Sequence, residues 1–229
     1  MRMLTHELTR PATHLDESTW EMALKAPPAT LSDKLHASGR HEQVMRHDIQ
    51  SLDGDIVILG VARTISSKPM IGLPEPGREY ELLFRAIDSV EPGEVIVTDE
   101  TSCCVWGELC AEAAIRRRGN GIVIDGFHRD SRGLRALRFP VFSRGRHLSD
   151  LLYHRTITAI NEPVRCGGVL VHAGDLIAGN DDGVVVVPAD MVLSIVTEAY
   201  DKSQRENEVR IALQRGMSAT DAYREFGVM

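Results

Sequence analysis

The sequence predicts an α/β or α+β fold that ends in helices. In the centre of the chain, apolar runs typical of buried strands alternate with helical patterns. A β-rich segment follows from Val164, and helical spacing returns from Ala189. The chain has 229 residues, 43% hydrophobic and 26% charged, as is usual for globular proteins. This length suits one large domain or two small ones and can bury a sizeable core.

The first third of the chain is predicted to hold few regular elements. Residues 1–28 are expected to form a polar N-terminal arm with one helical stretch around Trp20. A short helix that holds Leu31 and Leu35 is predicted, with Thr30 or Ser32 as its N-cap and Gly39 at its end. The apolar run at 55–61 is typical of a buried strand, whereas 66–78 is rich in proline and glycine and is predicted to be a loop.

The rest of the chain gives clearer patterns. Helices are predicted over 79–90, 107–118 and 131–137, and strands over 94–98, 121–125 and 140–142. Gly119 is expected to take the C′ position after the second of these helices. Further strands are predicted over 169–171, 175–178 and 184–187, with a turn at 180–183. One long helix or two are predicted over 189–215, and a short helix around Ala222.

Net charge and the lack of long apolar runs argue against two classes of partner, nucleic acids and membranes. The 26 Lys and Arg residues against 33 Asp and Glu give a net charge of −7, whereas a nucleic-acid binder normally shows a basic face. No apolar run approaches the ~20 residues of a membrane helix. The N-terminus carries Glu7, Asp16 and Glu17 and has no apolar segment of the kind that a signal peptide needs. We therefore expect neither nucleic-acid nor membrane binding.

Cysteine usage and glycine motifs narrow the class further. The spacing of the four cysteines fits neither a zinc knuckle nor a redox pair, so a reducing cytoplasm is expected: Cys103, Cys104, Cys110 and Cys166. The chain has no GxGxxG after a strand and no GxxxxGK[ST]. These absences remove the simplest case for a dinucleotide oxidoreductase, a P-loop enzyme or a common methyltransferase.

The densest group of chemically useful residues lies at 107–108 and 125–130. Strand ends and helix N-termini offer free N–H groups to an anion, and their side chains face a crevice. Arg129 can hold a carboxylate with two hydrogen bonds, and Asp130 can bind Mg²⁺. Glu108 can reach the same metal, directly or through water, if helix and strand are neighbours. The alternative is a turn in which Arg129 and Asp130 form salt bridges with nearby charges.

Other candidates have simpler explanations. His128 is expected to face away from Arg129, because neighbouring residues of an extended chain point in opposite directions. Cys103 and Cys104 are predicted to be small buried residues rather than nucleophiles, since no histidine partner is evident. The nine histidines form neither an HxH nor an HExxH group, so no zinc site is indicated.

Three stretches of sequence resemble one known family. GELCAEAAIRRRGNGIVIDGFHRD, FPVFSRG and AGDLIAGNDDGVVVVP, in this order, resemble the family of the regulator of ribonuclease E activity A and 4-hydroxy-4-methyl-2-oxoglutarate aldolase. The similarity covers roughly residues 28–227. The family's pattern of an acidic residue, twenty residues and Arg-Asp falls on Glu108, Arg129 and Asp130. Two departures are Glu108, where the aldolases often have Asp, and Asn180, where many members have Asp.

The resemblance implies a fold and an assembly. It implies a swivelling β/β/α-type domain with a helical C-terminus, here a single aldolase-like α/β domain at 29–229 after the arm. It further implies a homotrimer or homohexamer with sites at subunit interfaces. An acidic residue from a neighbouring subunit supports the metal waters in the family, and Glu206 or Glu208 is the candidate here.

The resemblance also implies residue roles. In the aldolase branch, Mg²⁺ or Mn²⁺ binds at the position of Asp130, with Glu108 acting through water. Arg129 contacts the pyruvyl part of the oxo-acid substrate. The helix start at Gly107, with the backbone amides of Leu109 and Cys110, holds the substrate carboxylate.

These residues together predict a class II, metal-dependent lyase. We expect it to cleave a 4-hydroxy-2-oxo mono- or dicarboxylic acid to pyruvate, and to decarboxylate oxaloacetate through the same enolate. Arg129 and Glu108 are the expected catalytic residues. The alternatives are a non-catalytic regulator that binds a ribonuclease and another enolate-forming enzyme, such as a sugar-acid lyase or dehydratase.

Overall fold

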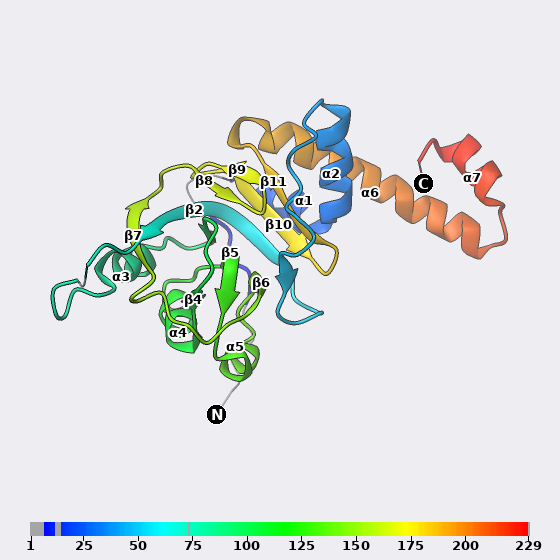
Figure 1. Cartoon of the computed structure of the whole chain (residues 1–229). Coiled ribbons are helices and arrows are strands. Elements are labelled where there is room, and N and C mark those ends of the chain that lie inside the picture. The colour runs from blue at the N-terminus through cyan, green and yellow to red at the C-terminus, as the bar shows by residue number, and fades with distance from the viewer. Residues whose placement is uncertain (1–6, 12–14, 73, 229) are drawn as a thin grey trace.

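One bent mixed sheet organises the protein, which a computed structural model describes over residues 7–11, 15–72 and 74–228 (Figure 1). The strand order is β1-β6-β5-β3-β2-β10-β11, with β4 beside β5 and β7 beside β2. The strands are β1 (Gln50–Ser51), β2 (Ile58–Pro69), β3 (Glu94–Thr98), β4 (Cys104–Trp106), β5 (Gly121–His128), β6 (Val141–Arg146), β7 (Arg155–Ile160), β10 (Leu176–Asn180) and β11 (Gly183–Val187). A separate hairpin is formed by β8 (Val164–Cys166) and β9 (Val169–Val171).

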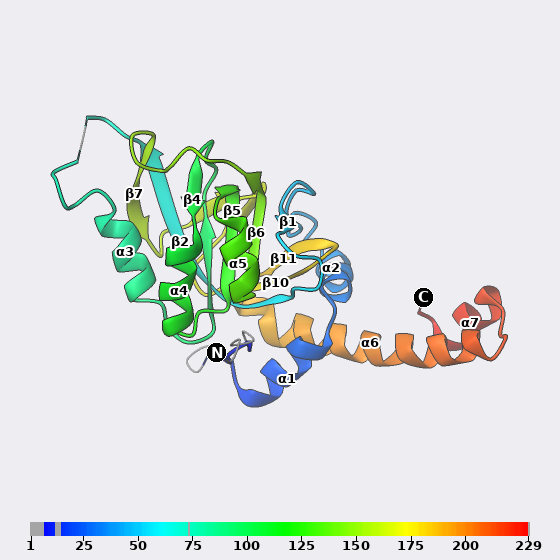
Figure 2. The same cartoon turned by 90° about the horizontal axis from the view of Figure 1, so that it is seen from below.

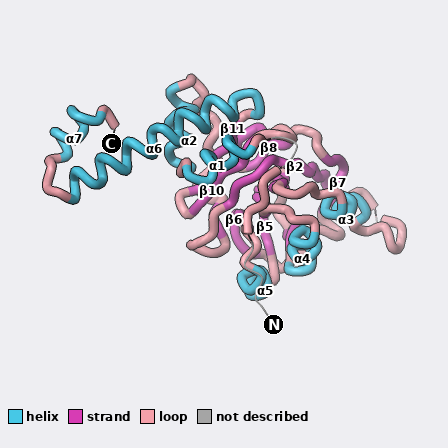
Figure 3. The backbone as a smooth tube through the Cα atoms, turned by 180° about the vertical axis from the view of Figure 1, so that it is seen from behind, coloured by secondary structure: helices cyan, strands magenta, loops and turns pink. Residues whose placement is uncertain are grey.

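The helices gather in two groups. Figure 2 shows the first group side by side along one face of the sheet: α3 (Glu81–Asp88), α4 (Glu108–Arg116) and α5 (Ser131–Leu137). Figure 3 shows the second group beside β10 and β11: α1 (Glu17–Lys25), α2 (Pro28–Ala37) and α6 (Val192–Gln214). A 3₁₀ turn, η1 (Ala189–Met191), precedes α6, and α7 (Ala219–Phe226) follows it. The predicted mixed α/β fold with a helical C-terminus is confirmed.

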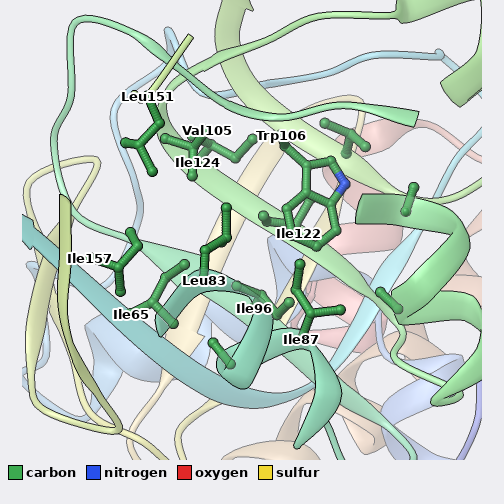
Figure 4. Packing of buried hydrophobic residues seen from close by; sticks show 14 of the residues in the cluster. Ile65, Leu83, Ile87, Ile96, Val105, Trp106, Ile122, Ile124, Leu151 and Ile157 are labelled. Carbon is green, nitrogen blue, oxygen red and sulfur yellow. The ribbon is translucent and has the colours of Figure 1, made fainter. Parts of the chain in front are cut away.

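Alternation along the parallel strands separates two cores. Ile96 and Ile122 face the first helix group, where they pack with Leu83 and Trp106 (Figure 4). Val97, the neighbour of Ile96, faces the opposite core beneath the β8–β9 hairpin. Successive side chains of a strand point to opposite faces, so these strands must be apolar throughout. This is why they read as continuous apolar runs.

The N-terminal arm contributes to a third core. Trp20 is 5% exposed and packs with Leu31 and Leu35 of α2 and with Ile195 of α6 against the sheet. Asp16 caps α1 by accepting a hydrogen bond from the N–H of Thr19. The helix expected around Trp20 is therefore present. Residues 1–6 and 12–14 of the predicted arm lie outside the described residues.

The C-terminal helix leaves the body of the protein. Figures 1 and 2 show α6 running away from the sheet, with α7 folded back beside its far end. The predicted segment at 189–215 is thus one long helix after a short turn, and the short helix around Ala222 is present. No helix in the described part of the chain combines the length and apolar character that crossing a membrane requires.

Two local predictions are wrong. Residues 66–69 belong to β2 rather than to a loop, because they pair with β7, about ninety residues further along the chain. The left-handed residue after α4 is Arg118 (φ 62°), not Gly119. Glycine is favoured at 119 because Val90 packs closely against this part of the backbone: a Cβ there would lie 3.0 Å from Val90 Cγ1.

Candidate active site

The candidate residues meet where three parallel strands end. β4, β5 and β6 run in the same direction, so their carboxyl ends share one edge of the sheet. β4 leads into α4, and β5 leads through Arg129 and Asp130 into α5. The loop after β6 brings Asp150 to the same place, beside Cys104. Glu108 and Arg129 are therefore close although twenty residues separate them, because those residues form one helix, α4, and one strand, β5, that returns to the same edge.

The start of α4 is shaped to receive an anion. Gly107 is the N-cap and has no side chain to satisfy the first turn, so the N–H groups of Leu109 and Cys110 have no intrahelical acceptor. The N–H of Glu108 donates to Asp130 Oδ2 at 3.3 Å. A Cβ at position 107 would lie 2.5 Å from that same oxygen. Glycine is needed here because the carboxylate of Asp130 approaches the backbone.

Asp130 holds a constrained backbone conformation. Its φ of 57° and ψ of 35° lie in the left-handed region, which aspartate tolerates better than most residues. The carbonyl of Asp130 accepts the N–H of Leu134, which starts α5, and the N–H of Arg129 donates to the Trp106 carbonyl at 3.0 Å. These bonds fix the Arg-Asp pair between β4 and α5. The exposed Asp130 side chain is left at the mouth of a cavity.

Arg129 is held by a partner that the sequence analysis missed. Its Nη2 lies 2.7 Å from Asp150 Oδ2. Asp150 Oδ1 accepts the Tyr80 hydroxyl at 3.1 Å and the N–H of Leu152 at 3.1 Å. Burial lowers the pKa of Arg129, but the neighbouring Asp150, Cys104 and Asp130 together outweigh burial, so the pKa is raised. Burial, with the nearby Asp150 carboxylate, raises the pKa of Tyr80 to about 12, so Tyr80 stays a hydrogen-bond donor.

A cavity of about 220 Å³ opens beside these groups. Its lining includes Gly107, Leu109 and Cys110 at the start of α4, together with Arg129 and Asp130 after β5. The remaining wall comes mainly from α3, β4 and the loop after β6: Tyr80, Leu83, Phe84, Cys104, Val105, Trp106, Asp150 and Leu151. A second, more open hollow shares Arg129 and Asp130 with this cavity and is otherwise lined by His128, Ser131, Arg146, His147 and Leu148.

Glu108 lies next to the cavity but does not line its described wall. Its carboxylate rests against α5, where a Cβ at Gly133 would collide with it. No group of three or more His, Cys, Asp or Glu side chains in the described ranges is arranged to hold a metal ion. The oxygen donors present are the carboxylate of Asp130 and that of Glu108 on the adjoining helix. This set fits Mg²⁺, which binds through one or two carboxylates and keeps several waters.

Cys103 and Cys104 are buried as the sequence predicts, and His128 is held by two serines of its own chain. His128 is 2% exposed, with Nδ1 2.8 Å from Ser143 Oγ and Nε2 3.1 Å from Ser131 Oγ. Burial, with the charges of Arg146 and Arg135, lowers its pKa to about 4, so the ring is neutral. Cys103 and Cys104 are buried. Desolvation raises the pKa of Cys104 to about 11, which leaves an unreactive thiol.

Glu206 and Glu208 lie far along the chain from this cavity, on α6. Glu206 forms an ion pair with Lys202 at 3.3 Å, and Glu208 is exposed. Because α6 leaves the body of the protein, neither carboxylate belongs to the cavity of its own chain (Figure 1). A contribution from either one requires a neighbouring subunit, which stays a prediction.

Fold and site together define an α/β protein with free backbone amides at a helix start and an Arg-Asp pair at its strand ends. The chain belongs to the RraA-like family (Aldolase/RraA), whose pattern it matches over residues 28–186. The resemblance seen in the sequence is thereby confirmed.

Two curated relatives illustrate the range of the family. A protein of Halalkalibacterium halodurans named "Putative 4-hydroxy-4-methyl-2-oxoglutarate aldolase" is 33% identical over 180 residues, which cover 77% of this chain and 81% of the relative. Protein DlpA of Legionella pneumophila is 29% identical over 203 residues, 86% of this chain. The matched part spans only 32% of the length of DlpA.

Two solved structures share the fold. An uncharacterized protein from Pseudomonas syringae pv. tomato aligns with a TM-score of 0.80 and 27% identity, covering 92% of this chain and 98% of its own. Streptomyces coelicolor RraAS2, described as an unusual member of the RNase ES inhibitor RraA protein family, aligns with a TM-score of 0.76 and 29% identity. That alignment covers 86% of this chain and 98% of the Streptomyces chain. The predicted fold type is therefore that of the RraA proteins.

Proposed function

We propose that the protein is a divalent-metal-dependent lyase that cleaves a 4-hydroxy-2-oxo acid to pyruvate. One observation carries the proposal: Arg129, Asp130 and the first residues of α4, whose amides lack acceptors within the helix, line one cavity. The aldolase name of the Halalkalibacterium relative supports the reaction class. The same site would decarboxylate oxaloacetate, because loss of CO₂ from that acid also leaves the enolate of pyruvate.

The pyruvyl group has a complementary binding place. Its carboxylate would accept hydrogen bonds from the N–H groups of Leu109 and Cys110, where the helix dipole adds positive potential. Arg129 would face the 2-oxo group, and Asp150 would keep the guanidinium in that position. This arrangement puts positive charge where negative charge develops during the reaction.

Asp130, with Glu108 acting through water, would hold the metal. A bound Mg²⁺ or Mn²⁺ would supply Lewis-acid polarisation of the 2-oxo group. Gly107 would let the Asp130 oxygen keep this position, since a Cβ at residue 107 would lie 2.5 Å from it. Glu108 would orient a water rather than touch the substrate, because its carboxylate lies against Gly133.

The bond changes balance without a covalent intermediate. Water would take the proton of the 4-hydroxyl group, and the electron pair of the C3–C4 bond would pass into the 2-oxo group. Arg129 would stabilise the resulting enolate, and protonation at C3 would give pyruvate. No lysine is needed, and the sequence has none between Lys68 and Lys202. Burial keeps the nearby Cys104 thiol protonated, so a thiolate nucleophile is not part of this mechanism.

The proposal includes an assembly and a location. We place the sites at the interfaces of a homotrimer or homohexamer in the cytoplasm, with Glu206 or Glu208 of a neighbouring copy beside the metal waters. The projection of α6 from the body of the protein supports a role between subunits (Figure 2). Sedimentation of the full chain, with and without Mg²⁺, would measure the number of copies.

Pyruvate release tests the reaction directly. The purified protein should release pyruvate from 4-hydroxy-4-methyl-2-oxoglutarate, from a related 4-hydroxy-2-oxo acid or from oxaloacetate when Mg²⁺ is present. EDTA should abolish release, and added Mg²⁺ should restore it. Folded, metal-supplied protein that yields no pyruvate from any of these acids would contradict the proposal.

A regulatory role is the second candidate. It is favoured by the Streptomyces structure, whose description places it among inhibitors of a ribonuclease. In this case the protein would slow RNA cleavage by a bound ribonuclease. The effect would survive EDTA and the change Arg129→Ala, whereas the lyase reaction would not. Measuring both activities on the same preparations separates the two functions.

A further inference from the structure

We infer that His147 is a further catalytic residue of the proposed lyase: its Nε2–H group donates a hydrogen bond to the oxygen on C4 of the substrate. That oxygen becomes negatively charged when the 4-hydroxyl group loses its proton. The inference rests on the proposed lyase function and adds one residue to the same site.

A backbone hydrogen bond fixes the position of the proton on the His147 ring. The N–H of Ser149 donates to His147 Nδ1 at 3.1 Å, so Nδ1 must present a lone pair. A neutral imidazole carries one ring proton, which in this tautomer is on Nε2. The ring also lies against Phe127, with 5.5 Å between the ring centroids. Within the described parts of the chain no acceptor is bonded to Nε2, so this N–H can donate to a ligand.

The loop that orients this imidazole also holds Arg129. His147 directly follows β6, and its backbone N–H donates to the last carbonyl of β5 at 3.0 Å. The carbonyl of Ser149 accepts the N–H of Cys104 at 2.7 Å, which fastens the loop to β4. The next residue, Asp150, pairs with Arg129. Bonds within one chain therefore set the position of the imidazole relative to Arg129.

The two hollows together give the substrate a path toward His147. Arg129 and Asp130 line both of them, so a substrate can extend from one to the other. In the proposed binding mode the pyruvyl carboxylate lies in the first cavity, on the α4 amides, and the 2-oxo group lies beside Arg129. C3 and C4 then continue into the second hollow, whose volume is about 520 Å³ and whose lining includes His147.

His147 is better oriented for this contact than the other donor of the second hollow. Arg146 lines the same hollow, but no hydrogen bond or ion pair within the described residues fixes its guanidinium. The His147 N–H is held in one direction by Ser149 and Phe127. A donor that is oriented before the reaction stabilises developing charge without further reorganisation. Arg146 adds positive potential to the hollow, and His147 contacts the oxygen on C4.

This hydrogen bond acts where charge develops during cleavage. Water takes the proton of the 4-hydroxyl group, and negative charge builds on its oxygen. The C3–C4 bond then breaks, its electron pair forms the enolate of pyruvate, and the oxygen becomes the carbonyl of the second product. The enolate takes a proton at C3. His147 keeps its own proton throughout, so the atom balance of the proposed reaction is unchanged.

Oxaloacetate provides an internal control, because it has no 4-hydroxyl group. Its C4 carboxylate loses its charge as CO₂ departs, so a hydrogen bond to that carboxylate is stronger in the ground state than in the transition state. Loss of the His147 N–H should therefore slow the aldol cleavage and not the decarboxylation, although both reactions pass through the same enolate.

Paired kinetics of two variants test the inference. We would measure kcat with Mg²⁺ for the 4-hydroxy-2-oxo acid that the protein cleaves fastest and for oxaloacetate. His147→Phe keeps a ring against Phe127 and removes the donor, so kcat for cleavage should fall at least ~10-fold. The kcat for decarboxylation should stay within ~3-fold. His147→Gln places an amide N–H near the position of Nε2 and should restore most of the cleavage rate.

His154→Phe is the matched control. His154 is an exposed histidine of the same loop, 3.1 Å from Ser149 Oγ, and it lines neither hollow. This change should leave both reactions within ~2-fold of the unchanged protein. Equal losses in both reactions of His147→Phe, an unaffected cleavage rate, or the same loss in His154→Phe would overturn the inference and leave the lyase function intact. Absence of pyruvate from every acid with the unchanged protein would overturn both.

Nitrogen NMR of the isotope-labelled, metal-free protein tests the tautomer without any turnover. At mildly alkaline pH, where imidazole is neutral, the His147 signals should show the ring proton on Nε2. His147→Phe identifies these signals by their absence. A proton on Nδ1 would overturn the inference, because Nε2 could then accept a hydrogen bond but not donate one.

Discussion

Two polar regions at the carboxyl ends of the parallel strands differ in how their charges are paired. The first is the candidate site around Arg129 and Asp130. The second, which we call the Asp125 cluster, is a cavity lined by Arg46, Ser66, Asp99, Glu100, Asp125, Pro163, Val164 and Arg165. Both regions receive residues from β5, a few positions apart, so the same strand supplies two polar regions with different properties.

In the Asp125 cluster the carboxylates have strong partners within the protein. Asp125 is 1% exposed and accepts hydrogen bonds from Arg46 Nη2 and from the N–H of Gly167, both at 2.8 Å. Asp99 accepts from the N–H and the hydroxyl of Ser67 at 2.9 and 2.8 Å. Buried polar groups that are paired in this way fix neighbouring elements to one another. Here they fasten the β8–β9 hairpin to the sheet.

In the candidate site Arg129 is paired with Asp150 at 2.7 Å, but Asp130 and the start of α4 have weaker partners. Asp130 accepts one long hydrogen bond from the N–H of Glu108, and the amides of Leu109 and Cys110 have no acceptor within their helix. The Asp130 carboxylate and these amides can therefore form further hydrogen bonds, and a ligand could supply the partners. The difference shows that charge density alone does not identify a site, because the Asp125 cluster holds more charged residues than the lining of the candidate cavity.

The largest expected effect comes from removing the charges of the candidate site. Arg129→Ala and Asp130→Asn should each lower kcat/KM for pyruvate release at least ~10²-fold, as for the loss of one charged transition-state contact. Asparagine is chosen at 130 because it tolerates the left-handed backbone that alanine would strain. Urea unfolding should show little change in stability. Near-full activity in either variant would remove these residues from the site.

The reverse pattern is expected for the Asp125 cluster. Asp125→Asn leaves Arg46 without its buried charged partner, so the free energy of unfolding should fall by about 2 kcal/mol, typical of a hydrogen bond to a charged group. The activity of the protein that remains folded should stay within ~2-fold of the unchanged protein. Urea unfolding and the pyruvate assay measure the two quantities. A stable but inactive Asp125→Asn variant would show that both regions take part in the reaction.

The smallest effect is expected for the residue that holds Arg129. Asp150→Asn keeps the size of the side chain and an acceptor for Tyr80 but weakens the hold on the guanidinium. We expect kcat to fall ~10-fold and KM to change less than ~3-fold, since Arg129 keeps its charge but loses its orientation. Tyr80→Phe removes only the hydrogen bond to Asp150 and should have a weaker effect. A rise in KM with unchanged kcat would assign Asp150 to substrate binding instead.

Much of the fold was predictable because its central strands are apolar on both sides. The run at 94–98 matches β3 to the residue, and the run at 121–125 lies inside β5. The end of β2 was not predictable. Ser66, Ser67 and Lys68 are polar, and they become strand because β7 pairs with them from far along the chain. Local patterns report local preferences, whereas pairing between distant segments depends on the whole fold.

The candidate site was predictable in part for the same reason. Arg129 and Asp130 stand directly after a recognisable strand, so their position at a strand end follows from the sequence. Asp150 lies in a segment with no distinctive pattern, and Tyr80 lies at the start of a predicted helix that carries no motif. Asp150 reaches Arg129 because β6 runs parallel to β5, and Tyr80 reaches Asp150 because the start of α3 lies against the loop that follows β6. The sequence contains no signal that would have selected them.

The sequence by itself determined the mixed fold, the helical C-terminus and the Glu108, Arg129 and Asp130 pattern, because periodicity and motif spacing are local properties of a chain. The tertiary structure alone decided which carboxylates are paired and which stay available. It also placed Phe84 and Leu151 in the wall of the cavity, although neither belongs to the motif. Pairing and cavity shape depend on distances between segments that are remote in sequence, and folding alone sets those distances.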